Sequence, residues 1–170
     1  LVGSEMCIRD RGLGWNFFLK QPNSNQTPTA SSAGNNDQQV EKYQKLLKEN
    51  PKNMDALVAL ANLYLEQGEL EKAIPVLEKI AVIQPNNLDW QFNLAKLYEL
   101  SDQTDKAEKI YDQMLSKNPK EFKALVGKAM LRQAKGDSQT ANSLFKIAED
   151  VAPSPDLKKK IRELSQAKSK

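Results

Sequence analysis

The residues that carry catalytic chemistry do not combine into a catalytic set in this sequence. The 170 residues include no histidine, which removes the commonest general base and the commonest metal ligand. Cys7 is the single cysteine, so neither a disulfide framework nor a cysteine-based metal site is predicted. There is no glycine-rich phosphate loop, and the carboxylates are scattered. We therefore expect a protein that is not an enzyme and that holds no metal ion or other cofactor.

The charges of the sequence are distributed unevenly. Residues 37–155 contain 16 Lys and Arg against 18 Asp and Glu, whereas residues 156–170 contain 6 against 2. The excess of positive charge therefore belongs to the C-terminal segment, where we interpret the run Lys158–Lys160 as a solvated helix face. Nucleic-acid recognition requires basic residues on one face of the folded part, so we expect no nucleic-acid partner.

Between Asp37 and Pro155 the sequence repeats itself at a step of 34 residues. Prolines, alanines and large apolar residues recur at equivalent places in successive segments. They are Pro51, Pro85, Pro119 and Pro153; Ala61, Ala95 and Ala129; Ala73, Ala107 and Ala141; and Leu77, Tyr111 and Phe145. A step of 34 residues is the length of a helix–turn–helix repeat unit.

Each unit has the pattern of two amphipathic helices. In the first unit one apolar face recurs at spacings of three and four residues; it consists of Leu57, Leu60, Ala61, Leu63 and Tyr64. Gly68 follows this face and is suited to the positive φ that ends a helix. Ala73, Leu77 and Ile80 form the second face, and Pro85 ends the unit. Pro75 falls inside the second helix, where we expect a local bend and not a break.

This pattern resembles the tetratricopeptide repeat (TPR). The first unit carries Leu57-x2-Leu60-Ala61-x2-Tyr64, Ala73, Leu77 and Pro85; the second carries Leu94-Ala95-x2-Tyr98, Ala107, Tyr111 and Pro119; the third carries Leu125, Ala129, Ala141, Phe145 and Pro153. The resemblance implies an all-α, TPR-like α-solenoid, which is a right-handed superhelix of antiparallel helix pairs. The third unit departs from the family at Lys128 and Arg132, where a leucine and a tyrosine are expected. We interpret this departure as the loosened pattern of a terminal repeat.

The chain is expected to divide into three segments. Residues 1–36 are predicted to be a disordered stub and linker, because Gln21–Asn36 is uncharged and poor in apolar residues. Within them, residues 1–11 resemble translated adaptor sequence and are expected to be non-native. Residues 37–155 form the array, with a half unit at 37–53 and units at 54–87, 88–121 and 122–155. Residues 156–170 form a basic capping helix that turns Leu157, Ile161 and Leu164 inward.

The apolar stretch Gly12–Lys20 leaves two interpretations open. It is too short to span a bilayer, and it is either the remnant of a membrane anchor or signal segment or an ordinary apolar stub. The location of the protein is accordingly open between the cytoplasm and a membrane, and a bacterial source is expected. Contact with a membrane through a lost N-terminal segment stays open, and no oligomeric state is predicted.

The resemblance also implies a binding surface, because the first helices of such repeats line a concave face. The side chains predicted to contact a partner there are Asn62, Phe92, Asn93, Lys96, Lys123 and Met130. Phe92, Val126 and Met130 form either an apolar binding stripe or packing contacts with neighbouring helices. We expect a scaffold or adaptor that binds a protein or peptide. The alternative is a membrane-tethered assembly factor or co-chaperone whose anchor is truncated.

One branch of the family binds the C-terminal carboxylate of chaperones with two lysines, two asparagines and an arginine. Asn62, Asn93 and Lys123 match three of these positions, but Val58 stands in place of a lysine and Gly127 in place of the arginine. Without those two cations most of the charge-assisted hydrogen bonding to a carboxylate is lost. We therefore expect another extended or helical segment to bind.

Overall fold

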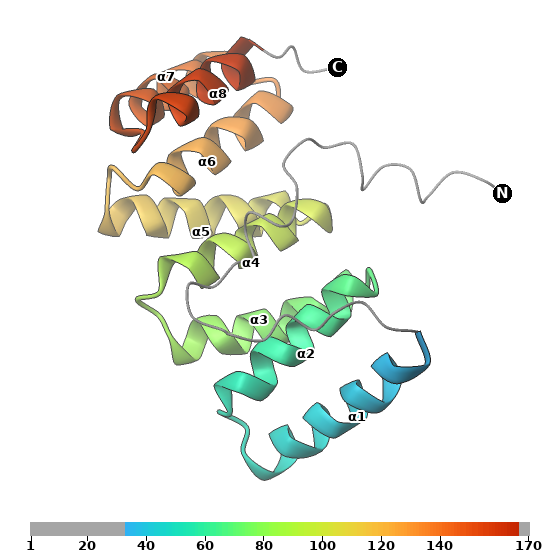
Figure 1. Ribbon diagram of the computed structural model, residues 1–170. Helices are drawn as coiled ribbons and strands as arrows, with labels where there is room; N and C mark the ends of the chain where they lie inside the picture. The colour runs from blue at the N-terminus through green and yellow to red at the C-terminus, as the bar shows by residue number, and fades with distance from the viewer. Residues whose placement is uncertain (1–32, 167–170) are drawn as a thin grey trace, which may run out of the picture. The chain divides into compact units, whose positions relative to one another are not determined.

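The computed structural model describes residues 33–166, which form eight helices stacked in chain order (Figure 1). The helices are α1 (Ala33–Glu49), α2 (Met54–Glu66), α3 (Leu70–Ile83), α4 (Leu88–Leu100), α5 (Thr104–Lys117), α6 (Phe122–Ala134), α7 (Ser138–Val151) and α8 (Pro155–Gln166). The predictions for the stub, the anchor remnant and most of the linker concern residues 1–32, which lie outside the described residues.

The helices pack as the repeat pattern predicts. Each helix from α2 to α8 contacts its neighbour in sequence, and α1 is joined to α2 by a 2.9 Å hydrogen bond from Gln44 Nε2 to the Tyr64 hydroxyl. The pairs α2–α3, α4–α5 and α6–α7 are the three predicted units. The prediction of an all-α array of antiparallel helix pairs with a C-terminal capping helix is confirmed.

The first helix begins earlier than the sequence pattern indicated. α1 starts at Ala33, so the predicted boundary at Asp37 lies within this helix. Residues 33–36 lack apolar periodicity, but a helix that has nucleated extends one residue at a time at little cost. At the other end of the array, α8 spans Pro155–Gln166, so it begins at the last residue of the predicted third unit and covers residues 156–166 of the predicted capping segment.

The turn inside each unit uses a residue with positive φ, and Gly68 and Gly136 take this place with φ of 73° and 83°. In both turns the next backbone N–H reaches back across the helix end. Glu69 N donates to the Tyr64 carbonyl at 2.8 Å, and Asp137 N donates to the Arg132 carbonyl at 2.9 Å. This bond satisfies a carbonyl that has no partner within the helix. The role predicted for Gly68 is thereby confirmed.

The connectors between units fix where each first helix begins. Asn53 Oδ1 accepts a hydrogen bond from Ala56 N at 3.1 Å, and Asn87 Oδ1 accepts one from Asp89 N at 3.1 Å, which caps α2 and α4. The connectors before α2, α4 and α6 are four residues long, at 50–53, 84–87 and 118–121. The connector before α8 has only three, at 152–154.

Pro75 lies within α3 without interrupting it. Its ring removes the backbone donor for the carbonyl of Glu71. Both residues are exposed, so water can reach that carbonyl. The expectation that Pro75 does not break the helix is confirmed.

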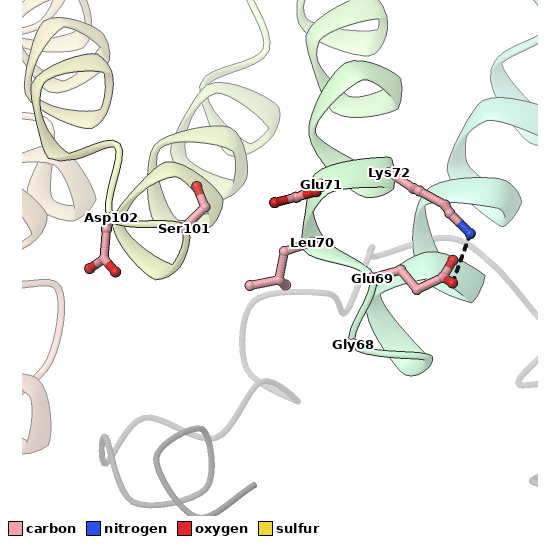
Figure 2. Close-up of a pocket in the computed structure, with 7 residues that line it drawn as sticks. All are labelled: Gly68, Glu69, Leu70, Glu71, Lys72, Ser101 and Asp102. Carbon is pink, nitrogen blue, oxygen red and sulfur yellow. Dashed lines mark hydrogen bonds and ion pairs between the residues drawn. The ribbon is translucent and has the colours of Figure 1, made fainter. Parts of the chain in front are cut away.

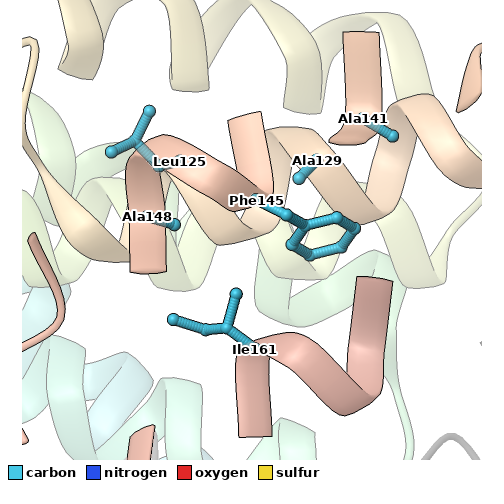
Figure 3. Close-up of a cluster of buried hydrophobic side chains, with 6 residues drawn as sticks. All are labelled: Leu125, Ala129, Ala141, Phe145, Ala148 and Ile161. Atoms are coloured by element: carbon cyan, nitrogen blue, oxygen red, sulfur yellow. The ribbon is translucent and has the colours of Figure 1, made fainter. Parts of the chain in front are cut away.

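The core consists of the residues that recur at the 34-residue step. Ala73, Ala107 and Ala141 are 1% exposed or less, as are Ala61, Ala95 and Ala129. In the last unit the buried side chains come from α6, α7 and α8, with Phe145 at the centre of the cluster (Figure 3). Its members are Leu125, Ala129, Ala141, Phe145, Ala148 and Ile161. The apolar stripe predicted on α8 therefore packs inward at Ile161.

No helix within residues 33–166 is long and apolar enough to cross a bilayer.

Candidate functional site

The first helices of successive units carry the predicted binding residues, and two of these helices are neighbours. α4 contacts α6 directly, and Lys123 Nζ forms an ion pair with Asp89 one unit earlier. The partly exposed side chains of α4 and α6 therefore lie on one surface, to which we assign the equivalent side chains of α2 by the repeat. We call this surface the first-helix face and define it by Asn62, Asn93, Lys96, Lys123 and their neighbours on these helices.

Two asparagines supply the neutral polar groups of the first-helix face. Asn62 on α2 and Asn93 on α4 are both partly exposed. Within residues 33–166 neither side chain forms a hydrogen bond. Each carboxamide offers donors and an acceptor, so each can bind the N–H and C=O of another backbone. Both side chains therefore lie outside the helix core, as the sequence predicted, and are available to bind a ligand.

The two lysines of the predicted site are already bound to acids of the same chain. Lys96 Nζ lies 2.7 Å from Glu99 Oε2 on the same helix. Lys123 is paired with Asp89, as described above. Both cations are therefore neutralised locally, and they are not free positive charges awaiting an acidic ligand.

The two apolar residues of the predicted site face the interior. Phe92 is only 4% exposed, and its ring centroid lies 6.0 Å from that of Tyr111. Met130 packs, together with Val126, against the buried cluster of α6–α8. The sequence left two interpretations open for Phe92, an apolar binding stripe or packing against neighbouring helices. The structure shows the packing. The burial of Phe92 argues against direct contact with a partner, whereas Met130 and Val126 keep a partly exposed surface.

Tyr111 is the centre of a polar arrangement that the sequence pattern did not reveal. Its side chain is fully buried, and its hydroxyl donates a 2.5 Å hydrogen bond to Glu99 Oε1. Glu99 thus joins the Lys96 ammonium to the Tyr111 phenol. Burial raises the pKa of Tyr111 well above its usual value, and the charge of Glu99 and the hydrogen bond act in the same direction. The sequence did contain one signal of this arrangement, because Glu99 is an acid at the position where the preceding unit has Leu65.

Gly127 stands where the carboxylate-binding branch of the family has its arginine, and the fold leaves no room for a side chain there. A Cβ atom at this position would lie 2.5 Å from Tyr111 Cζ. Real Cβ atoms do not approach that closely, so Tyr111 or α6 would have to shift. The sequence already indicated that the positive charge of a carboxylate clamp is missing here. The structure adds that an arginine side chain would not fit at this position.

A shallow hollow of about 520 Å³ lies away from these residues, between the turns that follow α2 and α4 (Figure 2). Its lining combines Leu70 with the acids Glu69, Glu71 and Asp102, and Lys72 is paired with Glu69 at 2.8 Å. The acids are solvated at its edge. No group of three or more potential metal ligands occurs among the described residues.

Comparison with known proteins identifies the family. The tetratricopeptide-repeat family model matches residues 30–86 and 71–129, which together make up more than half of the chain. The chain therefore belongs to the tetratricopeptide-repeat family. Repeats of this family are in general protein-interaction modules and are typically not catalytic.

Three solved structures illustrate the likeness. The crystal structure of MamA shares 18% identity, with a TM-score of 0.61 over 78% of this chain and 86% of MamA. TTC0263, a thermophilic TPR protein in Thermus thermophilus, shares 20% identity, with a TM-score of 0.55 over 77% of this chain and 73% of that one. YrrB, described as a TPR protein with an unusual peptide-binding site, shares 17% identity, with a TM-score of 0.58 over 78% and 74%. At these identities the likeness concerns the fold. No curated protein matches the sequence.

Proposed function

We propose that this protein is a non-catalytic adaptor that binds a peptide segment of a partner protein on the first-helix face. Family membership supports a protein-interaction role. The observation that carries the proposal to this face is the pair Asn62 and Asn93, whose carboxamides are partly exposed and unbonded within residues 33–166. YrrB, which has a similar fold, is described as having a peptide-binding site, and this agrees with the proposal.

The chemistry of the face favours recognition of a peptide backbone. A carboxamide can donate to a carbonyl and accept from an N–H of the same extended segment, independently of its side chains. Lys96 and Lys123 remain at the edges of the proposed contact, but their charges are matched by Glu99 and Asp89. The bound segment is therefore expected to be held by amides and by the exposed parts of Val126 and Met130, not by a carboxylate clamp.

The test uses peptides selected against the full chain from a random library displayed on phage, with affinity measured by fluorescence anisotropy. The double variant Asn62→Ala with Asn93→Ala should weaken binding about fivefold or more, because two or more hydrogen bonds are lost at about 0.5–1.5 kcal/mol each. Its thermal stability should be almost unchanged.

The matched control removes two exposed amides from second helices. Gln113 on α5 and Asn142 on α7 are both exposed. The double variant Gln113→Ala with Asn142→Ala should bind the selected peptides at full affinity. If this control loses binding and the Asn62/Asn93 variant does not, the partner binds the second helices and the proposed face is wrong.

A further inference from the structure

The contact between the second and third units includes a row of ion pairs along the whole length of α6. Three basic residues of α6 and its C-cap residue Lys135 each reach an acid in the second unit. The pairs are Lys123–Asp89, Lys128–Asp112 at 2.5 Å, Arg132–Glu108, Lys135–Asp105 at 3.1 Å and Lys135–Glu108 at 2.9 Å. All four basic residues thus bridge from the third unit to α4 or α5.

The corresponding contacts earlier in the array are made differently. Tyr64 on α2 accepts a hydrogen bond from Gln44, and Tyr98 on α4 donates one to Glu78, in each case across a separation of 20 residues. Arg132 occupies the equivalent place on α6, and Asp112 is the equivalent of Glu78.

The buried leucines of those earlier contacts are also replaced. Leu60 and Leu94 are 4% and 6% exposed, and Lys128 stands at the same place on α6. Lys128 and Arg132 were interpreted from the sequence as the loosened pattern of a terminal repeat. That interpretation stays a prediction, and the structure adds that both side chains form ion pairs with acids on α5.

On its other side α6 belongs to a core of its own. The buried cluster described above draws all six members from α6, α7 and α8. Among the partly buried apolar residues packed against it, Leu115 is the one contributed by α5. Residues 122–166 therefore have an apolar cluster of their own. Their attachment to the second unit combines the ion pairs with close packing, in which Gly127 of α6 lies against the buried Tyr111 ring of α5.

Some of these ion pairs are accessible to dissolved salt, whereas Arg132 and Glu108, at 32% and 15% exposed, are screened less. The paired side chains Lys123 and Asp89 are 39% and 57% exposed, and Asp112 is 51% exposed. Exposed pairs are screened as ionic strength rises, whereas buried apolar contacts are not weakened in this way. In addition, Arg132 Nε is buried without a hydrogen-bond partner among the described residues, so the attachment is imperfectly satisfied.

We propose that the α5–α6 contact is a salt-sensitive hinge: screening its ion pairs weakens the attachment of residues 122–166 to α2–α5, so that these residues open more often as one unit. The hinge divides the first-helix face, because Asn62, Asn93 and Lys96 lie on one side of it and Lys123 and Met130 on the other. Ionic strength would then change the position of the two parts of that face relative to each other, whatever ligand they bind.

The experiment is hydrogen–deuterium exchange on the full chain, measured by mass spectrometry at low salt and in about 1 M NaCl, where the Debye length falls to about 3 Å. We expect the peptides of α6, α7 and α8 to exchange about fivefold faster at high salt, together, as a screened ion-pair network opens. Peptides of α2, α3 and α4 should change by less than about twofold, because their units are joined by hydrogen bonds and apolar contacts. An equal response in both halves overturns the proposal.

Two variants separate the hinge from a general effect of salt. Lys128→Leu with Arg132→Tyr installs the residue types of the earlier units and removes two of the ion-paired cations, so it should reduce the extra response of α6–α8. Glu108→Gln removes the acid shared by Arg132 and Lys135, and at low salt it should raise the exchange rate of α6–α8 part of the way toward the rate that the unsubstituted chain shows at high salt. Lys72→Gln, which breaks the ion pair with Glu69 inside the first unit, is the control and should leave the difference between the halves unchanged. A Glu108→Gln chain that exchanges like the unsubstituted one at low salt contradicts the hinge even if the double variant does not fold.

Discussion

Asp102 occupies the same left-handed turn, 34 residues later, that Gly68 occupies in the first unit. Its φ is 58°, against 73° for Gly68, and Gln103 N donates to the Tyr98 carbonyl at 2.8 Å as Glu69 N does to Tyr64. A residue with a Cβ is strained in this region, although Asp tolerates it better than most. The repeat geometry therefore imposes on Asp102 a backbone conformation suited to glycine.

Asp102→Gly should stabilise the chain. The variant relieves the left-handed strain, and the gain, net of the greater freedom of glycine in the unfolded chain, is expected to be about 0.5–1 kcal/mol in the free energy of unfolding. Urea denaturation measures it. Gly136→Ala is the reverse test, because nothing lies within 4 Å of its Cβ and only the φ of 83° is violated. That variant should lose about 1 kcal/mol, and equal stability of both variants would contradict the argument.

Gly127→Ala should destabilise the chain, although glycine within a helix normally gains from this change. The expected cost is about 1–3 kcal/mol, because the added methyl collides with the Tyr111 ring. The ring cannot move away freely, since it is buried and bonded to Glu99. Thermal denaturation measures the loss. Combining the change with Tyr111→Leu should make the cost of Gly127→Ala smaller than in the unsubstituted chain, and a cost that stays the same would locate the clash elsewhere.

Stability should fall above about pH 10 in a way that depends on two tyrosines. Burial raises the pKa of Tyr98, with the hydrogen bond to Glu78 adding to it, and burial likewise raises the pKa of Tyr111. The unfolded chain releases these phenolic protons near pH 10, whereas the folded chain keeps them. The stabilisation that comes from the raised pKa of these two tyrosines is therefore fully present below that pH, and it is lost from the free energy of unfolding as the pH rises.

The measurement is the free energy of unfolding between about pH 9 and pH 11, a range that spans the ordinary tyrosine pKa. Tyr98→Phe and Tyr111→Phe should each make the decline shallower than in the unsubstituted chain. Lysine ion pairs also weaken in this range, and comparing each variant with the unsubstituted chain cancels their effect. Parallel declines in all three chains would show that the phenols are not responsible.

Phe92→Ala should act on stability and not directly on binding. Removing a buried aromatic side chain typically costs about 3–5 kcal/mol, and Phe92 is 4% exposed against Tyr111. Chemical denaturation should show this loss, while peptide affinity measured well below the unfolding midpoint should be nearly that of the unsubstituted chain. If the variant stays stable but binds peptide more weakly, Phe92 contacts the peptide directly and the argument is wrong.

The 34-residue step predicted the fold because it reports the shape of one unit and its repetition. It placed Gly68 in its turn and Ala73 and Ala107 at the close helix contacts. The resemblance to the family, and not the step itself, implied that Asn62 and Asn93 lie on the surface, and both are partly exposed. The step did not reveal which neighbouring helix a side chain faces, and so Phe92 was assigned to a surface when it lies against Tyr111.

Most of the ion pairs between the second and third units could not be predicted from the sequence for a related reason, although Lys123 and Asp89 are one repeat step of 34 residues apart. Arg132 and Glu108 are 24 residues apart, and Lys135 and Asp105 are 30 apart. Neither separation equals the repeat step, and neither is a spacing at which residues of one helix meet. Only the packing angle of α6 on α5 brings these side chains together, and a periodic sequence pattern does not predict that angle.

The three-residue connector before α8 changes the register of that helix relative to the first helices of the earlier units, whose connectors have four residues. Counted from the start of each helix, Lys158 and Arg162 take the places that Leu125 and Ala129 hold on α6. Leu125 and Ala129 belong to the buried cluster that α6 shares with α7 and α8. α8 is thus charged at two positions where α6 packs through apolar side chains. Restoring one connector residue together with leucine and alanine at those positions would give α8 the apolar face by which a first helix attaches its partner helix.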